Sequence, residues 1–181
     1  MDSSGTFLQY TKESASYVPE KVMEYSYSIS DMFMGYIPGS VSETSVFAIL
    51  IGAAILIFTG IGSWRTMLSV FIGGYIMSLL FNLWGVNELM LLPAHLHLIL
   101  GGFAFGAVFM ATDPVTAAQT NKGKYIVGFL IGVFAIIIRV FNPAYPEGMM
   151  MAILLLNIFA PLVDHYVIAA NIKRRLKRIK T

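Results

Sequence analysis

The sequence predicts an all-α integral membrane protein whose main domain crosses the bilayer five times. Of its 181 residues, 57% are hydrophobic and 12% are charged, and the mean hydropathy is +0.73. Soluble domains carry about 25% charged residues, so this chain has about half the usual charge content. The apolar residues gather after residue 43, in uncharged windows long enough to span a bilayer.

Residues 1–42 differ in composition from the rest of the chain. They mix tyrosine, serine and charges of both signs without a long apolar run, and the breaker "IPGS" (37–40) comes near their end. We therefore predict a polar segment outside the membrane or at its surface, with one or two short helices. Within it, "SSGT", which ends at Thr6, has the composition of a turn.

Five apolar windows define a predicted domain over residues 43–170. The first follows "SETS" (42–45), which offers helix-capping side chains, and the third and fifth contain Pro93 and Pro161. A straight spanning helix needs about 20 residues, so the last two windows are short unless their polar ends snorkel or the helices are broken. In order, the windows are 44–64, 66–87, 89–112, 125–138 and 148–163.

The positions of lysine and arginine predict how these spans are oriented in the membrane. The segment 171–181 is strongly basic, and beside a membrane span it indicates a cytoplasmic anchor, not a nucleic-acid site. Counting back from it places Arg65, Lys122 and Lys124 on the cytoplasmic side and residues 1–42 on the outer side of the membrane. An odd number of spans is what one half of an inverted-repeat transporter carries.

Arg139 stands near the outer end of the fourth window, before two prolines and Glu147. One interpretation is a tight turn stiffened by the prolines, in which Arg139 reaches the membrane surface or pairs with Glu147. The other is a kinked corner that lines a cavity, in which Arg139 binds the phosphate or carboxylate of an anionic ligand or cofactor.

Asp113 in "MATDPV" and Asp164 in "APLVDHY" lie at the predicted cytoplasmic ends of spans. Such acids are usually solvated at the membrane surface. Alternatively, both line the mouth of a sodium pathway, because carboxylate oxygens at membrane depth attract hard cations.

Glycines and histidines inside the spans favour structural roles. "GGFAFG" (101–106) and "GFLIG" (128–132) have the small-xxx-small spacing of packed membrane helices, with close approach of a flat cofactor as the alternative. His95 and His97 are two residues apart and point to different helix faces, which makes a poor chelate, although one of them could still ligate haem. The 181 residues contain no cysteine, which excludes thiolate zinc sites and cysteine-ligated iron–sulfur clusters within them.

Four stretches together resemble the B subunit of the sodium-translocating NADH:quinone oxidoreductases, from about residue 31 onward. The D subunit of the Rnf complex, which links ferredoxin and NAD, shares "FMATDPV" and "YPEG" and is the alternative. The family subunit is longer, so this chain resembles its C-terminal half. The stretches are "YIPGSVSETS" (36–45), "LILGGFAFGAVFMATDPVTAAQTNKGK" (98–124), "RVFNPAYPEGMMMAILLLNIFAPLVDH" (139–165) and "NIKRR" (171–175).

The resemblance implies a urea-transporter-like fold of two inverted five-helix repeats, of which this chain would be one. It also implies FMN, joined through its phosphate to a threonine in a Ser-Gly-Ala-Thr motif, together with riboflavin. The closest match here is "SSGT", which points to Thr6 as the FMN site, although the alanine is missing and Phe7 stands where the family has proline.

The same resemblance implies that the chain works inside a six-subunit complex in a bacterial inner membrane, with residues 1–42 on its periplasmic side. Electrons would pass through the flavins towards quinone, coupled to Na⁺ export, while NADH is oxidised in another subunit. Asp113 and Asp164 become candidates for sodium uptake, and Arg139 with Glu147 becomes a clamp near the flavin. A channel or solute transporter with the same helical architecture is the rival from another functional class.

Overall fold

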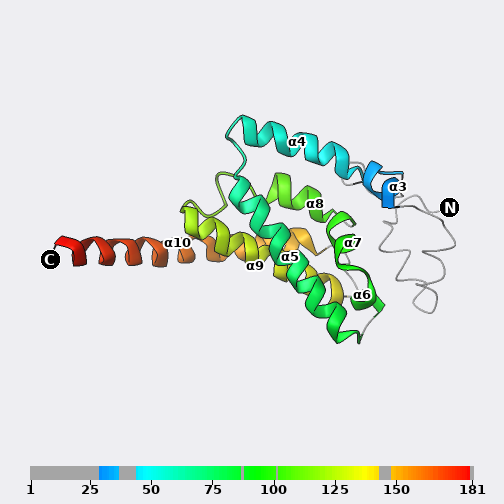
Figure 1. Cartoon of the computed structure of the whole chain (residues 1–181). Coiled ribbons are helices and arrows are strands. Elements are labelled where there is room, and N and C mark those ends of the chain that lie inside the picture. Colours follow the sequence, from blue (N-terminus) through cyan, green and yellow to red (C-terminus); the bar gives the residue numbers. More distant parts are fainter. Residues whose placement is uncertain (1–28, 37–43, 87, 101, 143–147, 180–181) are drawn as a thin grey trace.

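A computed structural model describes residues 29–36, 44–86, 88–100, 102–142 and 148–179 (Figure 1). All regular structure in these ranges is helical, with no strand among them, which confirms the predicted all-α class. The elements are α3 (Ile29–Met34), α4 (Val46–Phe58), α5 (Trp64–Trp84), α6 (Glu88–Leu91), α7 (Ala94–Ile99), α8 (Phe103–Phe105), the π-helical turn η1 (Gly106–Met110), α9 (Asn121–Phe141) and α10 (Met149–Ile179).

Three helices in the described part of the chain, α5, α9 and α10, are long and apolar enough to cross a membrane, as a multi-pass membrane protein requires. They correspond to the second, fourth and fifth predicted spans. The first span forms α4, which has only 13 residues and begins after Ser45, whose hydroxyl accepts the Ala48 N–H at 3.3 Å. The "SETS" capping prediction is thereby confirmed.

The third predicted span is interrupted early at Pro93, as the sequence predicts, and a second time at Gly102, which the sequence did not predict. It consists of α6, α7, α8 and η1, and we call these four elements together the broken segment. Pro93 separates α6 from α7, because proline cannot supply the N–H that a continuous helix would need there. Gly102 separates α7 from α8 with φ of +66°, a conformation that glycine adopts without steric cost.

The fourth and fifth spans are longer than their apolar windows. Helix α9 has 21 residues and includes Lys122, Lys124 and Arg139. Helix α10 has 31 residues, continues past Asp164, and crosses the predicted domain boundary at 170/171 without a break. Charged residues ended the predicted windows, yet they do not end these helices.

Helices α5 and α9 run parallel and side by side. At their starts, Arg65 Nη1 lies 3.2 Å from Asn121 Oδ1, and at their ends the rings of Phe81 and Phe141 are 5.7 Å apart. Glycine allows this close approach, because a Cβ atom on Gly132 would lie 2.6 Å from the backbone nitrogen of Gly74. The "GFLIG" stretch therefore packs helices, as its spacing predicts.

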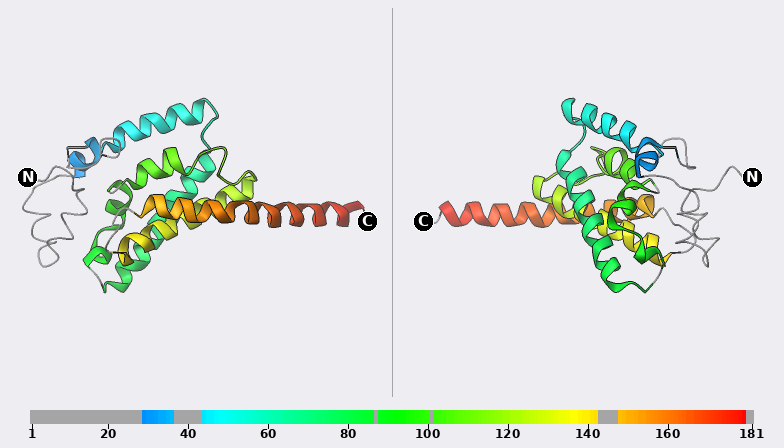
Figure 2. Two further views of the ribbon diagram at one scale, coloured as in Figure 1. Left: turned by 180° about the vertical axis from the view of Figure 1, so that it is seen from behind. Right: turned by 45° about the vertical axis from the view of Figure 1, so that its right-hand side comes forward.

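Helix α10 runs antiparallel to α9. Met149, at its start, packs on Gly106 of η1, and Asp164, further along, binds Thr120 immediately before α9. On another side of the bundle, α4 packs against α8 and η1 through a smaller apolar cluster. Beyond Asp164, α10 leaves the bundle and projects alone, as the views in Figures 1 and 2 agree.

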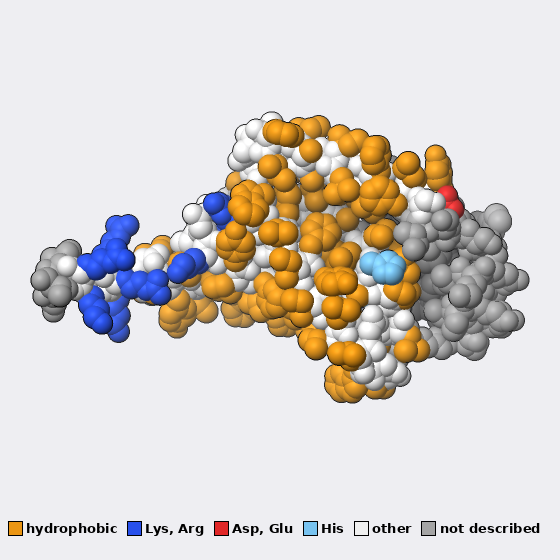
Figure 3. Space-filling view, in the orientation of Figure 1, with side chains coloured by type: hydrophobic (Ala, Val, Ile, Leu, Met, Phe, Trp, Pro, Cys, Tyr) orange, Lys and Arg blue, Asp and Glu red, His pale blue; other side chains and the backbone are white. Residues whose placement is uncertain are grey.

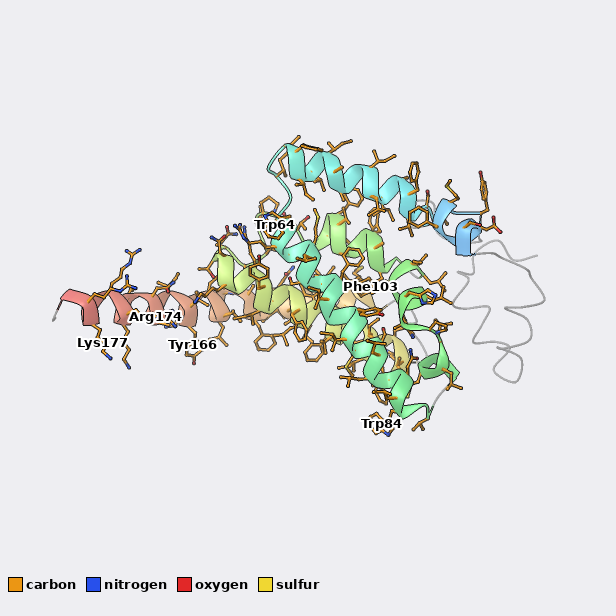
Figure 4. All side chains as sticks on the ribbon, viewed as in Figure 1. Trp64, Trp84, Phe103, Tyr166, Arg174 and Lys177 are labelled. Atoms are coloured by element: carbon orange, nitrogen blue, oxygen red, sulfur yellow. The ribbon has the colours of Figure 1, made fainter. Side chains whose placement is uncertain are left out.

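Tryptophans mark both ends of α5 (Figure 4). Trp64 and Trp84 are 20 residues apart, which at about 1.5 Å per residue is close to the roughly 30 Å of a bilayer's hydrocarbon core. Tryptophan favours the two membrane surfaces. Trp64 stacks edge-on against Tyr125, at 6.4 Å between ring centroids, and carries the Arg65 guanidinium 5.2 Å from its ring. We call this end of the bundle, which also holds Lys122, the basic end.

Candidate functional site

The broken segment interrupts a helix at the depth of the apolar core. Helix α7 ends at Ile99, the next residue, Leu100, has an extended backbone, and the fully buried Phe103 opens α8. Such a break leaves the last carbonyl oxygens of α7 without their usual helical donors. In a membrane, these polar groups must be satisfied by neighbouring protein groups.

Arg139 supplies the donors. Its Nη1 donates to the carbonyl oxygen of His97 at 2.6 Å, and its Nη2 donates to that of Leu100 at 3.1 Å. The side chain is 0% exposed, so it does not reach the membrane surface as one interpretation of the sequence expected. A helix C-terminus carries partial negative charge, which the guanidinium complements. Glu147, the other expected partner, lies outside the described residues.

Asn82 of α5 braces the other end of α7. With its amide nitrogen turned towards the carbonyls, Asn82 donates to Met90 O and to Leu92 O, the latter at 2.8 Å, and its oxygen accepts the Ala94 N–H at 3.2 Å. Sequence reasoning missed this residue, whose only signal was a strong hydrogen-bonding side chain late in an apolar window.

The two histidines of α7 point to different sides, as predicted. His97 is buried, whereas His95 is exposed. Among the described residues, no three His, Asp or Glu side chains come together in a group that could hold a metal ion. The broken segment is therefore an arrangement of main-chain dipoles held by Arg139 and Asn82.

Asp164 holds the start of α9. Its Oδ2 accepts the Gln119 N–H at 2.6 Å, and its Oδ1 accepts the Thr120 N–H at 3.1 Å together with the Thr120 hydroxyl. Thr120 is itself the N-cap of α9 and accepts the Gly123 N–H at 3.0 Å. The negative charge thus lies at a helix N-terminus, where it is stabilising.

Asp113 organises the loop that leads to α9. Its Oδ2 accepts the Thr116 hydroxyl at 2.8 Å and the Thr116 N–H at 3.3 Å, and its Oδ1 accepts the Val115 N–H at 3.3 Å. The Thr116 hydroxyl, and after it the Val115 N–H, lower the pKa of this exposed carboxyl. Asn157 of α10 donates to the Thr116 hydroxyl at 3.2 Å. Asp113 and Asp164 therefore fix the same loop, residues 113–120, at the basic end.

The structure brings the three described candidate residues to two different places. Asp113 and Asp164 share one loop, whereas Arg139 lies on the broken segment, near the other end of α9. Thr6, the predicted FMN attachment point, lies outside the described residues.

Comparison with known proteins identifies the family. Residues 1–173 match the profile of the NQR2, RnfD, RnfE family. A protein named as the B subunit of a Na(+)-translocating NADH-quinone reductase, from Chromohalobacter salexigens, is 57% identical over 158 residues, covering 86% of this chain and 38% of that protein. Proteins of the same name from Stutzerimonas stutzeri and Azotobacter vinelandii are 54% and 53% identical over 161 residues, covering 88% of this chain and 40% of theirs.

These matches confirm the resemblance found in the sequence motifs. The chain spans about two fifths of the length of the curated relatives that it matches. The family profile covers nearly all of the chain, and more than half of the aligned positions are identical in these relatives. The chain belongs to the NQR2, RnfD, RnfE family.

Proposed function

We propose that this chain forms part of the membrane subunit of a sodium-translocating NADH:quinone reductase, which passes electrons to quinone and couples their flow to Na⁺ movement. The identity of 57% with a protein of that name, over 86% of this chain, is the observation that carries the proposal. Because the chain spans about two fifths of such relatives, the activity is assigned to the assembled complex with its other subunits.

In this proposal, FMN is attached to Thr6, and riboflavin is the second flavin. The flavins supply the electron-transfer chemistry, while the protein positions them. The placement of α3 supports a periplasmic position for the segment that precedes it. Helix α4 leads from α3 to the turn before α5, and α5 starts at the basic end, so α3 lies at the opposite end of the bundle (Figure 1).

The flavin assignment is tested on the intact chain. Produced in a host that has the flavin transferase, the chain should gain the mass of an FMN group and fluoresce in a denaturing gel. Thr6→Ala should abolish both signals, whereas Thr11→Ala, in the same polar segment, should keep them. A chain without flavin in that host would contradict the assignment and favour the channel or transporter alternative, which shares the broken membrane helix.

Asp113 and Asp164 are proposed to line sodium uptake at the basic end. All four of their carboxylate oxygens accept hydrogen bonds, so Na⁺ would bind through the remaining lone pairs or in competition with these donors. Asp164→Asn in the assembled complex should therefore raise the Na⁺ concentration that gives half-maximal turnover. If Asp164→Asn lowered only the amount of folded chain and left the Na⁺ dependence of turnover unchanged, Asp164 would act as a helix cap and not in sodium uptake.

Arg139 acts in this proposal as a positioning residue. Two of its nitrogens already donate to main-chain oxygens, so its charge stabilises the broken segment. If Arg139 also bound an anionic group of the flavin, Arg139→Lys would change the flavin content of the complex or the reduction potential of the flavin. If Arg139→Lys changed only the stability of the folded chain, that role would be excluded.

A further inference from the structure

The start of α5 places a guanidinium at the basic end of the bundle. Arg65 donates from Nη1 to Asn121 Oδ1 at 3.2 Å, and no carboxylate of the described residues lies within 4 Å of its nitrogens. Lys122, the residue after Asn121, is exposed and likewise has no such carboxylate within 4 Å. The described part of the chain therefore supplies no ion pair to these two cations.

Trp64 and Tyr125 set the depth of this guanidinium. Their side chains are 47% and 39% exposed and pack edge-on, with 6.4 Å between ring centroids. The Cζ atom of Arg65 lies 5.2 Å from the centroid of the Trp64 ring, and Figure 4 shows Trp64 at the start of α5. Because exposed tryptophan and tyrosine favour the headgroup level of a bilayer, Arg65 is held where lipid phosphates lie.

Exposed apolar side chains lead from this aromatic pair into the membrane. Leu68 comes one turn after Trp64 on α5. Phe129 comes one turn after Tyr125 on α9. Side chains four residues apart share a helix face, so the contact between Trp64 and Tyr125 puts both rows on the same side of the helix pair. Leu68 and Phe129 are 47% and 36% exposed, and we call them the apolar strip.

The surroundings of α5 match this gradient from charge to apolar surface. Figure 3 shows hydrophobic side chains, and no lysine or arginine, over the middle of the face on which α5 lies. Lysine or arginine appears on that face only towards the basic end and on the last part of α10. A phospholipid has the same order of groups, with a charged phosphate above its acyl chains.

We propose that the basic end binds one anionic phospholipid, with its phosphate on Arg65 and an acyl chain along the apolar strip. Asn121 takes one of the guanidinium N–H groups, which leaves others free to donate in pairs to phosphate oxygens. Lys122 adds a second positive charge, so a zwitterionic headgroup, which carries a cation of its own, binds less well. Free phosphate shares the chemistry of the headgroup, but the apolar strip beside the cations favours a lipid. This site does not depend on the proposed function.

The test uses brominated lipid, which quenches tryptophan fluorescence at short range. The chain has two tryptophans, so Trp84→Phe leaves Trp64 as the single reporter. The full chain is placed in vesicles of equal parts phosphatidylglycerol and phosphatidylcholine, and only the lipid that carries bromine is switched. Quenching should report a relative affinity of about tenfold for phosphatidylglycerol over phosphatidylcholine next to Trp64.

Substitutions locate the preference. Arg65→Gln should lower the relative affinity to less than about twofold, and Arg65→Lys, which keeps the charge but loses the planar fork, to about fourfold. Lys173→Gln removes an equal charge from the last part of α10 and should leave the relative affinity unchanged. In a Trp64→Phe chain, the remaining Trp84, at the other end of α5, should show no preference.

Three results would overturn the lipid site. Equal quenching by the two brominated lipids would mean that no preference exists. Equal losses in Arg65→Gln and Lys173→Gln would mean that diffuse surface charge attracts the lipid. A preference abolished by inorganic phosphate, but not by chloride at the same ionic strength, would mean that Arg65 binds free phosphate. The measurement involves no electron transfer, so its outcome leaves the proposed function untouched.

Discussion

Replacing Arg139 with methionine isolates the contact that holds the broken segment together. Methionine keeps an unbranched side chain but removes both donors, leaving the carbonyl oxygens of His97 and Leu100 buried without them. Hydrogen bonds from charged groups contribute about 1.5–3 kcal/mol each, or about 3–6 kcal/mol for the pair. In membranes the unfolded chain also finds partners for its polar groups, which moves the expected loss towards the lower end, about 3 kcal/mol.

Amide hydrogen exchange on the full chain in lipid nanodiscs measures this loss locally. A local opening that becomes easier by about 3 kcal/mol speeds exchange roughly 100-fold, and the effect should fall on the amides of α7 and α8. The first turns of α5 should keep their protection. Arg139→Lys should give a smaller loss than Arg139→Met, although one ammonium group cannot bridge two carbonyls three residues apart as a guanidinium fork can.

The control for this experiment is Ile138→Met, which introduces the same side chain one residue earlier on α9. In this variant, the amide hydrogen exchange of α7 and α8 should match that of the unchanged protein. If Arg139→Met also left exchange in α7 and α8 unchanged, the two carbonyls would have other donors, and Arg139 would not brace the break.

Two further substitutions test the contacts that position α9. Gly132→Val should cost more than about 3 kcal/mol, because even its Cβ would lie 2.6 Å from the backbone nitrogen of Gly74, and the loss of folded chain is measured by size-exclusion chromatography. Ile126→Val on the exposed side of α9 should elute normally, and equal behaviour of the two variants would refute the close approach. Asp164→Asn should cost about 1–2 kcal/mol, because the amide turns a donor towards the N–H groups that the carboxylate accepts. Tryptophan-fluorescence melting measures that cost, and an unshifted midpoint would mean that the cap contributes no stability.

Hydropathy located the three long helices of the described chain but misplaced their ends. The second window, 66–87, overlaps α5 closely, because α5 contains one charged residue only, at its start. Windows four and five were cut short at Arg139 and Asp164, since a hydropathy window treats any charge as a boundary. Whether a charge ends a helix depends on partners from other helices, and those partners are far apart in sequence.

The third span shows a second limit, at the motif "GGFAFG". Its spacing predicts a helix-packing surface, and Gly106 does pack on Met149 of α10. Gly102, in the same motif, instead has a positive φ and separates α7 from α8. Glycine serves both purposes, close approach and a left-handed backbone, for the same reason: it lacks a Cβ. The sequence alone therefore could not predict which glycine breaks the helix.

Arg139 and Asp164 are stabilised in the same way: each lies against a helix end of opposite partial charge. Hydropathy alone could not predict either contact. Arg139, a cation, lies on the C-terminal carbonyls of α7, and Asp164, an anion, lies on the N-terminal amides at the start of α9. Each charge complements the partial charge of a helix end on a different element. Main-chain dipoles thereby contribute to stabilising a charge that lies inside an apolar helix. The carbonyl oxygens left by the interruption of the third span need donors from a facing helix, and Arg139 of α9 supplies two of them.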